Sequence, residues 1–564
     1  MRMTVNVILA LYLLSLPFLM RFLPDYEVVA LSVVLMAGCV SALLIGWKGG
    51  RVTVTVTDVL VFLLLLWACL SSVFVRHCEV DALGAYGWVA MCLLYGACCR
   101  MGRAEVFLLY AALALSGAVQ GVWSLLQGNG WLVEAGAEFP VTGGFGNPGP
   151  LGGYLAVAFV ASLSCLEQTK KRVEKAVFLI VLLLIGAALV ITDSRASWLS
   201  ALVASACWGW KVLPVEVRSW GKKWYVQLMV AGMFAGMLLG LYHYKKVSAD
   251  VRLLIWRAGM EMFADAPLLG HGVASFPMKY MDYQGAWLER HSDSHYCVLA
   301  DNNVQAFNEP LSLACEQGIV GCLLVAGLIA MALSGTRSGR FRPVLLALGV
   351  FSCFSYPTDS LALKMFFPML LGTLSCRRVW LAFALCRKSA VAVGFCLLWL
   401  LAVAAVPVVQ HYRTAFRQLE DETAKQCALP YHQKYMSRYA KCLLERGEEE
   451  TFCRVVGSGS FPFITSVLCC DLGMAYHRCG EAWRAEKTLW RAYWMVPSKI
   501  LPRFCLFRLY RDLGRKEDAK SMAEEILSLD VRQKGTVYLE ARTEALRYLK
   551  EAGGTLRQED VPEK

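Results

Sequence analysis

The run AVFLIVLLLIGAALVI, residues Ala176–Ile191, carries no charged side chain and follows directly on the charged pair Glu174 and Lys175. A helix needs about 20 mainly apolar residues to cross the hydrocarbon core of a bilayer, so this stretch is typical of a membrane span. Similar runs recur through most of the chain, which is 57% hydrophobic and only 18% charged. One soluble domain cannot bury that much apolar surface. The sequence therefore predicts an all-α, polytopic membrane protein.

About 12 to 13 segments are apolar enough to be transmembrane helices, although several are short. The candidates are Val5–Met20, Val28–Trp47, Val56–Val75, Leu83–Cys99, Val106–Leu126, Leu151–Leu166, Ala176–Ile191, Ala196–Trp210, Val226–Leu241, Ile319–Leu333, Val344–Phe354, Leu361–Leu374 and Ala390–Val409.

Basic residues give these spans an orientation. The loops after even-numbered spans are rich in Lys and Arg, as in Lys48 to Arg51, Lys170 to Lys175 and Arg377 to Lys388, whereas the odd-numbered loops are poor in both. Short basic loops stay on the cytoplasmic side of a membrane. We therefore expect the N-terminus inside the cell, the odd-numbered loops outside, and everything after Val409 outside.

The segment Arg252–Gly321 begins with a long polar stretch between two spans and concentrates ionisable residues. In a chain that is otherwise mostly apolar, such residues must face water, and we expect the chemistry of the protein there. They are Arg252, Arg257, Glu261, Asp265, His271, Arg290, His291, His295, Asp301 and Glu309.

These patterns divide the chain into four parts: N-terminal transmembrane helices over 1–242, the long outer loop over 243–310, C-terminal transmembrane helices over 311–410, and a charged helical region over 411–564. In the last part, apolar and small residues fall at the spacing of a tetratricopeptide repeat. They are Leu472, Gly473, Tyr476, Ala485, Leu489, Ala492 and Pro497, followed one period later by Tyr510, Ala519, Ala523 and Ile526. The alternative is an array of helical hairpins used for packing.

Metal binding has weak support in the sequence. His291 and His295 are four residues apart, which would place both imidazoles on one helix face. The serines and Asp293 between them favour a loop, in which a solvated turn or acid–base use of one histidine is the alternative. The 22 cysteines include no CxxC pair. We expect no metal and no cofactor.

Two short motifs at the outer surface each have two interpretations. The stretch Gly143–Pro150 is either simple punctuation before a helix or a backbone open enough for an anionic head group to approach its N–H groups. Arg195, in Asp193-Ser194-Arg195, is either a snorkelling anchor or part of a polar site, and we favour the site. Its planar guanidinium suits a diphosphate better than an ammonium would.

In order along the chain, four stretches resemble the O-antigen ligase and O-antigen polymerase superfamily of bacterial inner membranes. The order of the motifs and the long loop carry the resemblance, because each motif alone is loose. The stretches are Gly144–Pro148, Asp193–Trp198, Arg252 through Gly272, and Asn308–Gly321.

The resemblance implies that the protein transfers a glycan on the outer face of the inner membrane, with the C-terminal region in the periplasm. The donor would be a glycan on an undecaprenyl diphosphate carrier, and the acceptor would be lipid A core, a growing glycan or a protein hydroxyl. Ligase, polymerase and protein O-glycosylating activities differ in this acceptor and stay open. We expect no nucleic acid partner.

Arg195 and Arg252 match the arginine positions of the superfamily, which implies that they stabilise the leaving diphosphate. Charge that builds on a leaving group can be stabilised by preorganised arginines without a metal. Further candidates for contact with the diphosphate or glycan are Arg257, Arg290, Asn308, Asn147, Gly270 and Gly272.

One departure from the superfamily affects catalysis. Many members have a histidine immediately before the asparagine that corresponds to Asn308, and it is implicated in activating the acceptor hydroxyl; here that residue is Phe307. Phenylalanine cannot accept a proton, so Glu309 and His295 are our candidates for a general base, and an inactive relative is the alternative.

Two other classes of function compete with glycan transfer. A transporter or flippase of lipid-linked glycans would need charged residues along a path at mid-membrane, where the predicted spans have few, such as Asp58 and Lys364. A membrane scaffold that displays helical repeats would leave the arginine and glycine motifs unexplained. In the glycan-transfer interpretation, the repeats would offer a concave surface to a protein partner or a glycan acceptor.

Overall fold

The computed structural model describes residues 12, 15–18, 21, 50–75, 82–132, 138–221, 223–335, 339–375, 378–385, 407–421, 426–430, 432–459, 461–529 and 535–551. The chain forms two compact units that do not follow sequence order. Unit 1 comprises Met1–Tyr244 and Phe307–Arg413, and unit 2 comprises Lys245–Ala306 and Thr414–Lys564. The long loop therefore belongs to the same compact unit as the C-terminal helices.

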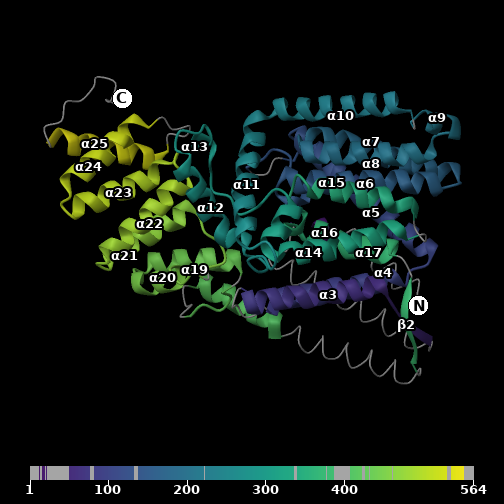
Figure 1. Ribbon diagram of the computed structural model, residues 1–564, viewed down its shortest axis with the longest axis horizontal. Helices are drawn as coiled ribbons and strands as arrows, with labels where there is room; N and C mark the ends of the chain where they lie inside the picture. Colours follow the sequence, from purple (N-terminus) through teal and green to yellow (C-terminus); the bar gives the residue numbers. More distant parts are fainter. Residues whose placement is uncertain are drawn as a thin grey trace. The chain divides into compact units, whose positions relative to one another are not determined.

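Unit 1 is a bundle of apolar helices. Its described helices are α3 (Val56–Leu70), α4 (Ala82–Cys99), α5 (Arg103–Gly128), α6 (Pro148–Gln168), α7 (Arg172–Ile191), α8 (Arg195–Val212), α9 (Val215–Trp220), α10 (Trp224–Tyr244), α14 (Glu309–Ser334), α15 (Arg342–Ser352), α16 (Leu361–Lys364) and α17 (Phe366–Leu374). Figure 1 shows α5 to α8 and α15 packed side by side.

Among the described residues, six helices are long and apolar enough to cross a membrane: Val56–Val73, α5, α6, α7, α10 and α14. This confirms the all-α, polytopic membrane class. Two further apolar segments, Gly87–Cys99 and Leu361–Leu374, are shorter. The predicted span Val28–Trp47 lies outside the described residues, and Val5–Met20 and Ala390–Val409 lie mostly outside them.

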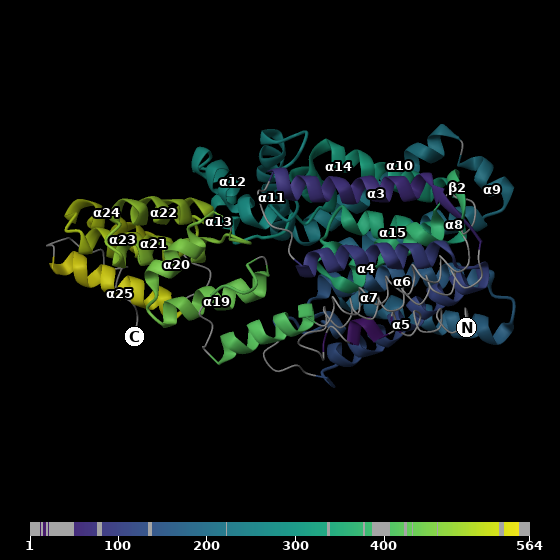
Figure 2. The same cartoon turned by 90° about the horizontal axis from the view of Figure 1, so that it is seen from below.

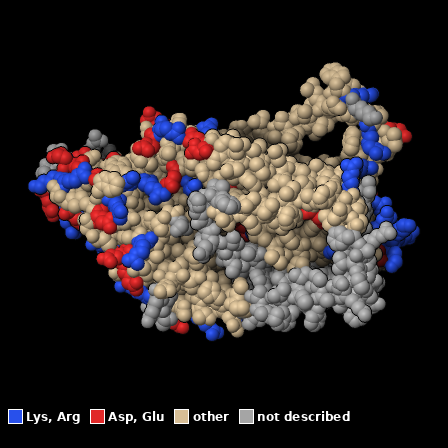
Figure 3. All heavy atoms as spheres, turned by 60° about the horizontal axis from the view of Figure 1, so that its bottom comes forward, with Lys and Arg blue, Asp and Glu red and all other residues tan. Residues whose placement is uncertain are grey.

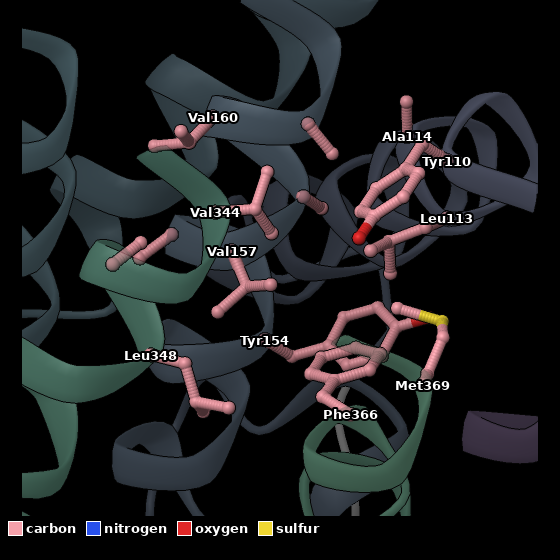
Figure 4. Packing of buried hydrophobic residues seen from close by; sticks show 14 of the residues in the cluster. Tyr110, Leu113, Ala114, Tyr154, Val157, Val160, Val344, Leu348, Phe366 and Met369 are labelled. Carbon is pink, nitrogen blue, oxygen red and sulfur yellow. The ribbon is translucent and has the colours of Figure 1, made fainter. Parts of the chain in front are cut away.

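Small residues allow close helix packing in unit 1, as is common in membrane proteins. A Cβ added to Gly153 would lie 2.3 Å from the ring of Phe351, and one added to Gly117 would lie 2.4 Å from the Cβ of Ala158. Tyr154 lies beside Phe366 in this core (Figure 4). Its hydroxyl donates a hydrogen bond of 2.8 Å to Ser116, so the buried polar group is satisfied.

A glycine interrupts α14 within the stretch Glu316–Gly321. Gly318 has φ 62° and ψ −166°, a conformation that an L-residue with a side chain avoids. The break frees the carbonyl of Gln317, which accepts a 3.1 Å hydrogen bond from the indole of Trp67. The glycine of this motif is therefore explained by the backbone.

Two strands in unit 1 were not predicted. β1 (Gly50–Thr55) and β2 (Val379–Leu385) pair antiparallel, with Arg51 opposite Ala384. Both strands border loops that the basic residues assign to the cytoplasmic side. Pairing requires the two loops to lie on the same side of the membrane. The pattern of basic residues also assigns both loops to one side.

Unit 2 combines the long loop with a series of helical hairpins (Figure 2). Its described helices are α11 (Lys246–Asp265), α12 (Phe276–Arg290), α13 (Tyr296–Leu299), α19 (Gln433–Glu445), α20 (Glu449–Val456), α21 (Ser466–Arg478), α22 (Ala482–Met495), α23 (Ile500–Asp512), α24 (Lys516–Ser528) and α25 (Thr536–Glu551).

The turns of three successive hairpins repeat along unit 2. Gly447, Gly480 and Gly514 each have φ between 70° and 81°, and they are 33 and 34 residues apart. Between α21 and α22 the packing is close, because a Cβ on Gly473 would lie 2.6 Å from the side chain of Leu489. The hairpin turns thus recur at intervals of 33 and 34 residues.

Candidate functional site

Two asparagines begin helices at one end of unit 1. Asn147 precedes α6, and its Oδ1 accepts a 2.8 Å hydrogen bond from the N–H of Gly149. Asn308 precedes α14, and its Oδ1 accepts a 3.0 Å bond from the N–H of Leu311. Both side chains are therefore N-caps, which satisfy N–H groups that a helix start leaves without an intrahelical partner.

The glycine loop before α6 is fastened to α5. The N–H groups of Thr142 and Gly143 donate to Oε1 of Gln127 at 2.9 and 2.8 Å, and the N–H of Gly144 donates to Oε1 of Gln120 at 2.8 Å. These three donors are occupied by protein. The loop positions the start of α6, and these donors do not form an open cradle for an anionic head group.

Arg195 is the first residue of α8 and is held against the end of α10. One of its terminal nitrogens donates a 2.7 Å hydrogen bond to the carbonyl of Leu241. Next to it, Asp193 adopts φ 51° and accepts a 3.2 Å bond from the hydroxyl of Tyr244. A guanidinium has five N–H donors. The bond to the Leu241 carbonyl uses one of these donors and fixes the side chain in place.

The start of α8 also packs on the start of α6. The hydroxyls of Ser194 and Ser197 are 2.7 Å apart. A Cβ on Gly152 would lie 2.4 Å from the Ser197 oxygen. Gly152 therefore lets the Arg195 segment approach the helix that Asn147 begins.

Phe307 stands where the resemblance to the superfamily predicts a histidine, and its ring packs against Tyr356. Phe307 adopts φ 49°, a conformation that is strained for a bulky residue. Its ring meets Tyr356 edge-on at 5.1 Å between centroids. The Tyr356 hydroxyl is in turn 3.6 Å from where a Cβ of Gly149 would be, so this pair connects the start of α14 to the start of α6.

Glu309 holds the neighbouring turn. Its Oε1 accepts hydrogen bonds from the backbone N–H of Thr358 at 3.0 Å and from the Thr358 hydroxyl at 2.5 Å. Both bonds use the same carboxylate oxygen. The carboxylate is thereby fixed next to Phe307.

In unit 2, two of the predicted arginines already have partners. The Arg257 guanidinium lies over the ring of Tyr296, 5.0 Å from its centroid. Arg290 forms a 2.5 Å ion pair with Glu261, in which both side chains are partly exposed. The charge of Arg290 is therefore largely compensated within unit 2. Arg252, on the same helix as Arg257, is half-buried.

The histidines of the loop differ in their surroundings. His271 contacts the carbonyl of Met262 through Nε2 at 2.8 Å and the ammonium of Lys279 through Nδ1 at 3.2 Å. Burial lowers the pKa of the His271 imidazole and Lys279 adds to this effect, while the Met262 carbonyl opposes it. His295 is exposed and lies against Tyr296, with ring centroids 4.0 Å apart. His295 is thus the more accessible base of the two.

Gly270 and Gly272 turn the chain between α11 and α12. They have φ 71° and 96°, which favour glycine. Their conformation accounts for the residue type without a ligand. Within the described ranges, no group of three or more His, Cys, Asp or Glu residues is arranged to hold a metal ion.

The structure therefore gathers four predicted site residues in unit 1 and six in unit 2. Those of unit 1 are Asn147, Arg195, Asn308 and Glu309; those of unit 2 are Arg252, Arg257, Gly270, Gly272, Arg290 and His295. Sequence reasoning missed Tyr356 and Thr358, which complete the end of unit 1. Their signal was a short polar turn, Tyr356 to Asp359, between two apolar runs.

Comparison with known families agrees with this arrangement. Residues 179–326 match the family model of O-antigen ligase. This part of the chain is similar to O-antigen ligases. The match contains Arg195, Arg252, Phe307, Asn308 and Glu309, and it spans parts of both units. A search of the curated proteins finds no match.

Proposed function

We propose that this protein transfers a glycan from an undecaprenyl diphosphate carrier to an acceptor on the periplasmic face of a bacterial inner membrane. The observation that carries the proposal is the position of Arg195. It lies inside the O-antigen ligase match, at the start of an apolar helix, with its guanidinium fixed by the carbonyl of Leu241. The acceptor is lipid A core, a growing glycan or a protein hydroxyl.

The chemistry assigns Arg195 to the leaving group. Cleavage of the bond between the anomeric carbon and the diphosphate transfers negative charge to a diphosphate oxygen. A fixed guanidinium stabilises that charge without reorganising, and it does so most strongly where water is scarce. We propose the same role for Arg252, which also lies inside the matched residues.

The acceptor hydroxyl must lose a proton as its oxygen attacks the anomeric carbon. Glu309 is the leading base, because Thr358 fixes one carboxylate oxygen in place through two hydrogen bonds. His295 is the second candidate, because it is exposed. Neither role requires a metal, so we propose a metal-independent transferase.

The surroundings of the spans supply further support. Asp58, one of the few acidic residues in an apolar span, caps α3 through Thr55 and accepts a 2.8 Å hydrogen bond from Tyr95. It is therefore accounted for by helix capping. The glycine turns at 33- and 34-residue intervals favour a tetratricopeptide-like array after Val409, which we place in the periplasm from the basic-loop pattern.

A strain that lacks the chain tests the proposal. We expect carrier-linked glycan to accumulate in its membranes and the transferred glycan to disappear, and wild-type chain should restore transfer. Arg195→Ala should restore less than about one hundredth of it, as expected for the loss of a charge-stabilising group. Arg172→Ala, which changes the exposed first residue of α7, is the matched control and should restore transfer fully. Full transfer by Arg195→Ala at normal abundance would overturn the role of Arg195.

A further inference from the structure

One face of α22 carries aromatic and basic side chains, of which Trp490 and Trp494 are half-buried. Trp483, Lys487, Trp490 and Trp494 follow one another at intervals of four, three and four residues, which places them on one face of a helix. The opposite face carries the fully buried residues Ala485, Leu489, Ala492 and Met495. The indole of Trp483 is 70% exposed. The aromatic face is thus a surface in its own right.

A cleft of about 410 Å³ opens beside the first part of this face, between α20, α21 and α22. Three cationic residues line it, Arg454, Arg484 and Lys487, and no acidic residue lines it. Glu481, outside the lining, pairs with Arg484 at 2.7 Å. Within the part of the chain that the structure describes, Arg454 has no ion pair. The cleft therefore carries a net positive charge.

Two of these cationic side chains lie over aromatic rings. The Lys487 ammonium lies 5.2 Å from the centre of the Trp483 ring, and Arg484 lies 5.8 Å from that of Tyr476. Gly457 makes room for the tyrosine, since a Cβ there would be 2.3 Å from the Tyr476 hydroxyl. The floor of the cleft is thus shaped by close packing.

A second cleft, of about 740 Å³, continues along the same helix between α22 and α12. It shares Lys487 and Thr488 with the first cleft and adds Trp490 and Trp494 to the lining. Two acidic residues, Asp282 and Glu289, also line it, so the site for an acidic group is the first cleft.

The walls of this second cleft are fixed. Arg491 binds both carboxylate oxygens of Asp282 at 2.5 and 2.7 Å, and Gln284 donates a 2.7 Å hydrogen bond to the carbonyl of Met495. The two clefts thus form one preorganised groove along α22, which lowers the entropic cost of binding.

The chemistry of the groove selects its ligand. Flat aromatic faces bind the apolar C–H faces of sugar rings while leaving the sugar hydroxyls to polar neighbours. Arginine and lysine side chains pair with a carboxylate or a phosphate. An extended chain of sugars with at least one acidic group matches both features.

We propose that the groove along α22 binds an acidic saccharide, with its carboxylate or phosphate in the cleft of Arg454, Arg484 and Lys487. This proposal rests on the proposed function, because it assigns the groove to part of the glycan substrate away from the bond that reacts. Binding energy from such a remote part of a substrate can be used to position the reacting group.

Binding to the full-length protein in detergent tests the proposal without requiring transfer. The probes are trigalacturonate, its trimethyl ester, maltotriose, and maltotriose phosphorylated on one primary hydroxyl, each measured by isothermal titration calorimetry. We expect at least one acidic probe to bind at least about tenfold more tightly than its neutral counterpart, and added salt to weaken it. The tighter acidic probe identifies carboxylate or phosphate as the preferred group.

Variants separate the groove from the rest of the surface. Trp483→Ala and Lys487→Gln should each weaken the acidic probe about tenfold. Trp224→Ala in unit 1 and Lys520→Gln on α24 change equally exposed residues and should leave binding unchanged. Arg195→Ala should bind the probe normally even if it transfers no glycan.

The opposite results would overturn the inference. Equal affinity for the acidic and neutral probes, no binding of either acid by the wild type, or normal binding by both groove variants would each do so. If transfer fails only in Arg195→Ala while no probe binds the wild type, the proposed function stands and the groove assignment falls. If the probes bind as expected but the wild type transfers no glycan, the groove assignment stands and the proposed function falls.

Discussion

The two units present opposite kinds of surface to their surroundings. Unit 1 exposes large apolar side chains such as Leu183 (74%) and Met233 (69%), as a surface in contact with lipid requires. Unit 2 covers itself with charges, seen as mixed blue and red in Figure 3. A charged residue is thus an exception in unit 1 and part of the ordinary surface in unit 2.

This difference changes how much a charged residue reveals. Arg195 and Glu309 in unit 1 are held by a carbonyl and by a threonine. Arg290 and Arg491 in unit 2 are each paired with a carboxylate. Surface ion pairs contribute little free energy, whereas a charge in an apolar unit is costly and points to function. We therefore give the residues of unit 1 the main roles in the reaction.

The largest expected effect is on Glu309. Glu309→Gln keeps the size of the side chain and its ability to accept from Thr358, but it removes the basicity. If Glu309 is the general base, glycan transfer should fall at least about a hundredfold in membranes with normal protein abundance. Thr358→Val, the control, removes one hydrogen bond and should cost less than about tenfold. If glycan transfer were lost in His295→Ala and kept in Glu309→Gln, the general base would be His295 in unit 2.

The core of unit 1 should tolerate no side chain at Gly153. Gly153→Leu would force an isobutyl group into the ring of Phe351, and we expect it to lower the free energy of unfolding by about 3 kcal/mol. Thermal unfolding in detergent measures this. Gly209→Leu on α8, where nothing lies within 4 Å of an added Cβ, is the matched control. Equal stability of the two variants would contradict the packing described for α6 and α15.

In unit 2, a half-buried carboxylate makes stability depend on pH. Burial raises the pKa of Asp471 from 3.8 to about 6. The folded state therefore binds more protons than the unfolded state between about pH 4 and pH 6, and stability falls as the pH rises through that window. Asp471→Asn should raise the free energy of unfolding by about 1 to 2 kcal/mol at pH 7 and give little gain at pH 4. A gain that is the same at both pH values would exclude this carboxylate as the cause.

The smallest effect is expected for Arg290. Its ion pair with Glu261 is partly exposed, so Arg290→Gln should change stability by less than about 1 kcal/mol. Glycan transfer should stay within about threefold of wild type, because the pair is accounted for on the surface of unit 2. Loss of transfer comparable with that of Arg195→Ala would show that Arg290, and with it unit 2, has a main role in the reaction.

Sequence reasoning predicted the six long apolar helices of unit 1, because the apolar runs themselves decide where helices lie in a membrane protein. The predicted spans Ala196–Trp210 and Val344–Phe354 form helices α8 and α15, which are not among those six. The predicted span Ala176–Ile191 ends at the same residue as α7. Sequence reasoning could not predict that β1 and β2 pair, because the two strands are more than 300 residues apart and neither is stable alone. Nor could it predict that the long loop joins the C-terminal helices in unit 2.

The site shows the same division. Motif order located Arg195, Asn308 and Glu309, which the structure gathers in unit 1. The roles of Asn147 and Asn308 as helix caps follow from side-chain geometry, which spacing along the chain does not give. Tyr356 was missed because its contact with Phe307 exists only in three dimensions.

The most direct test is transfer by purified protein in detergent, with an undecaprenyl diphosphate-linked glycan as donor and lipid A core as acceptor. The reaction should also be run with a hydroxyl-bearing protein and with a second carrier-linked glycan. We predict that the wild type releases undecaprenyl diphosphate and forms the transferred product with at least one acceptor. The same rate should persist with a metal chelator present, and Arg195→Ala should be at least about a hundredfold slower. Wild-type protein that transfers to none of the three acceptors, or Arg195→Ala that transfers as fast as wild type, would contradict the assignment of glycan transfer to unit 1.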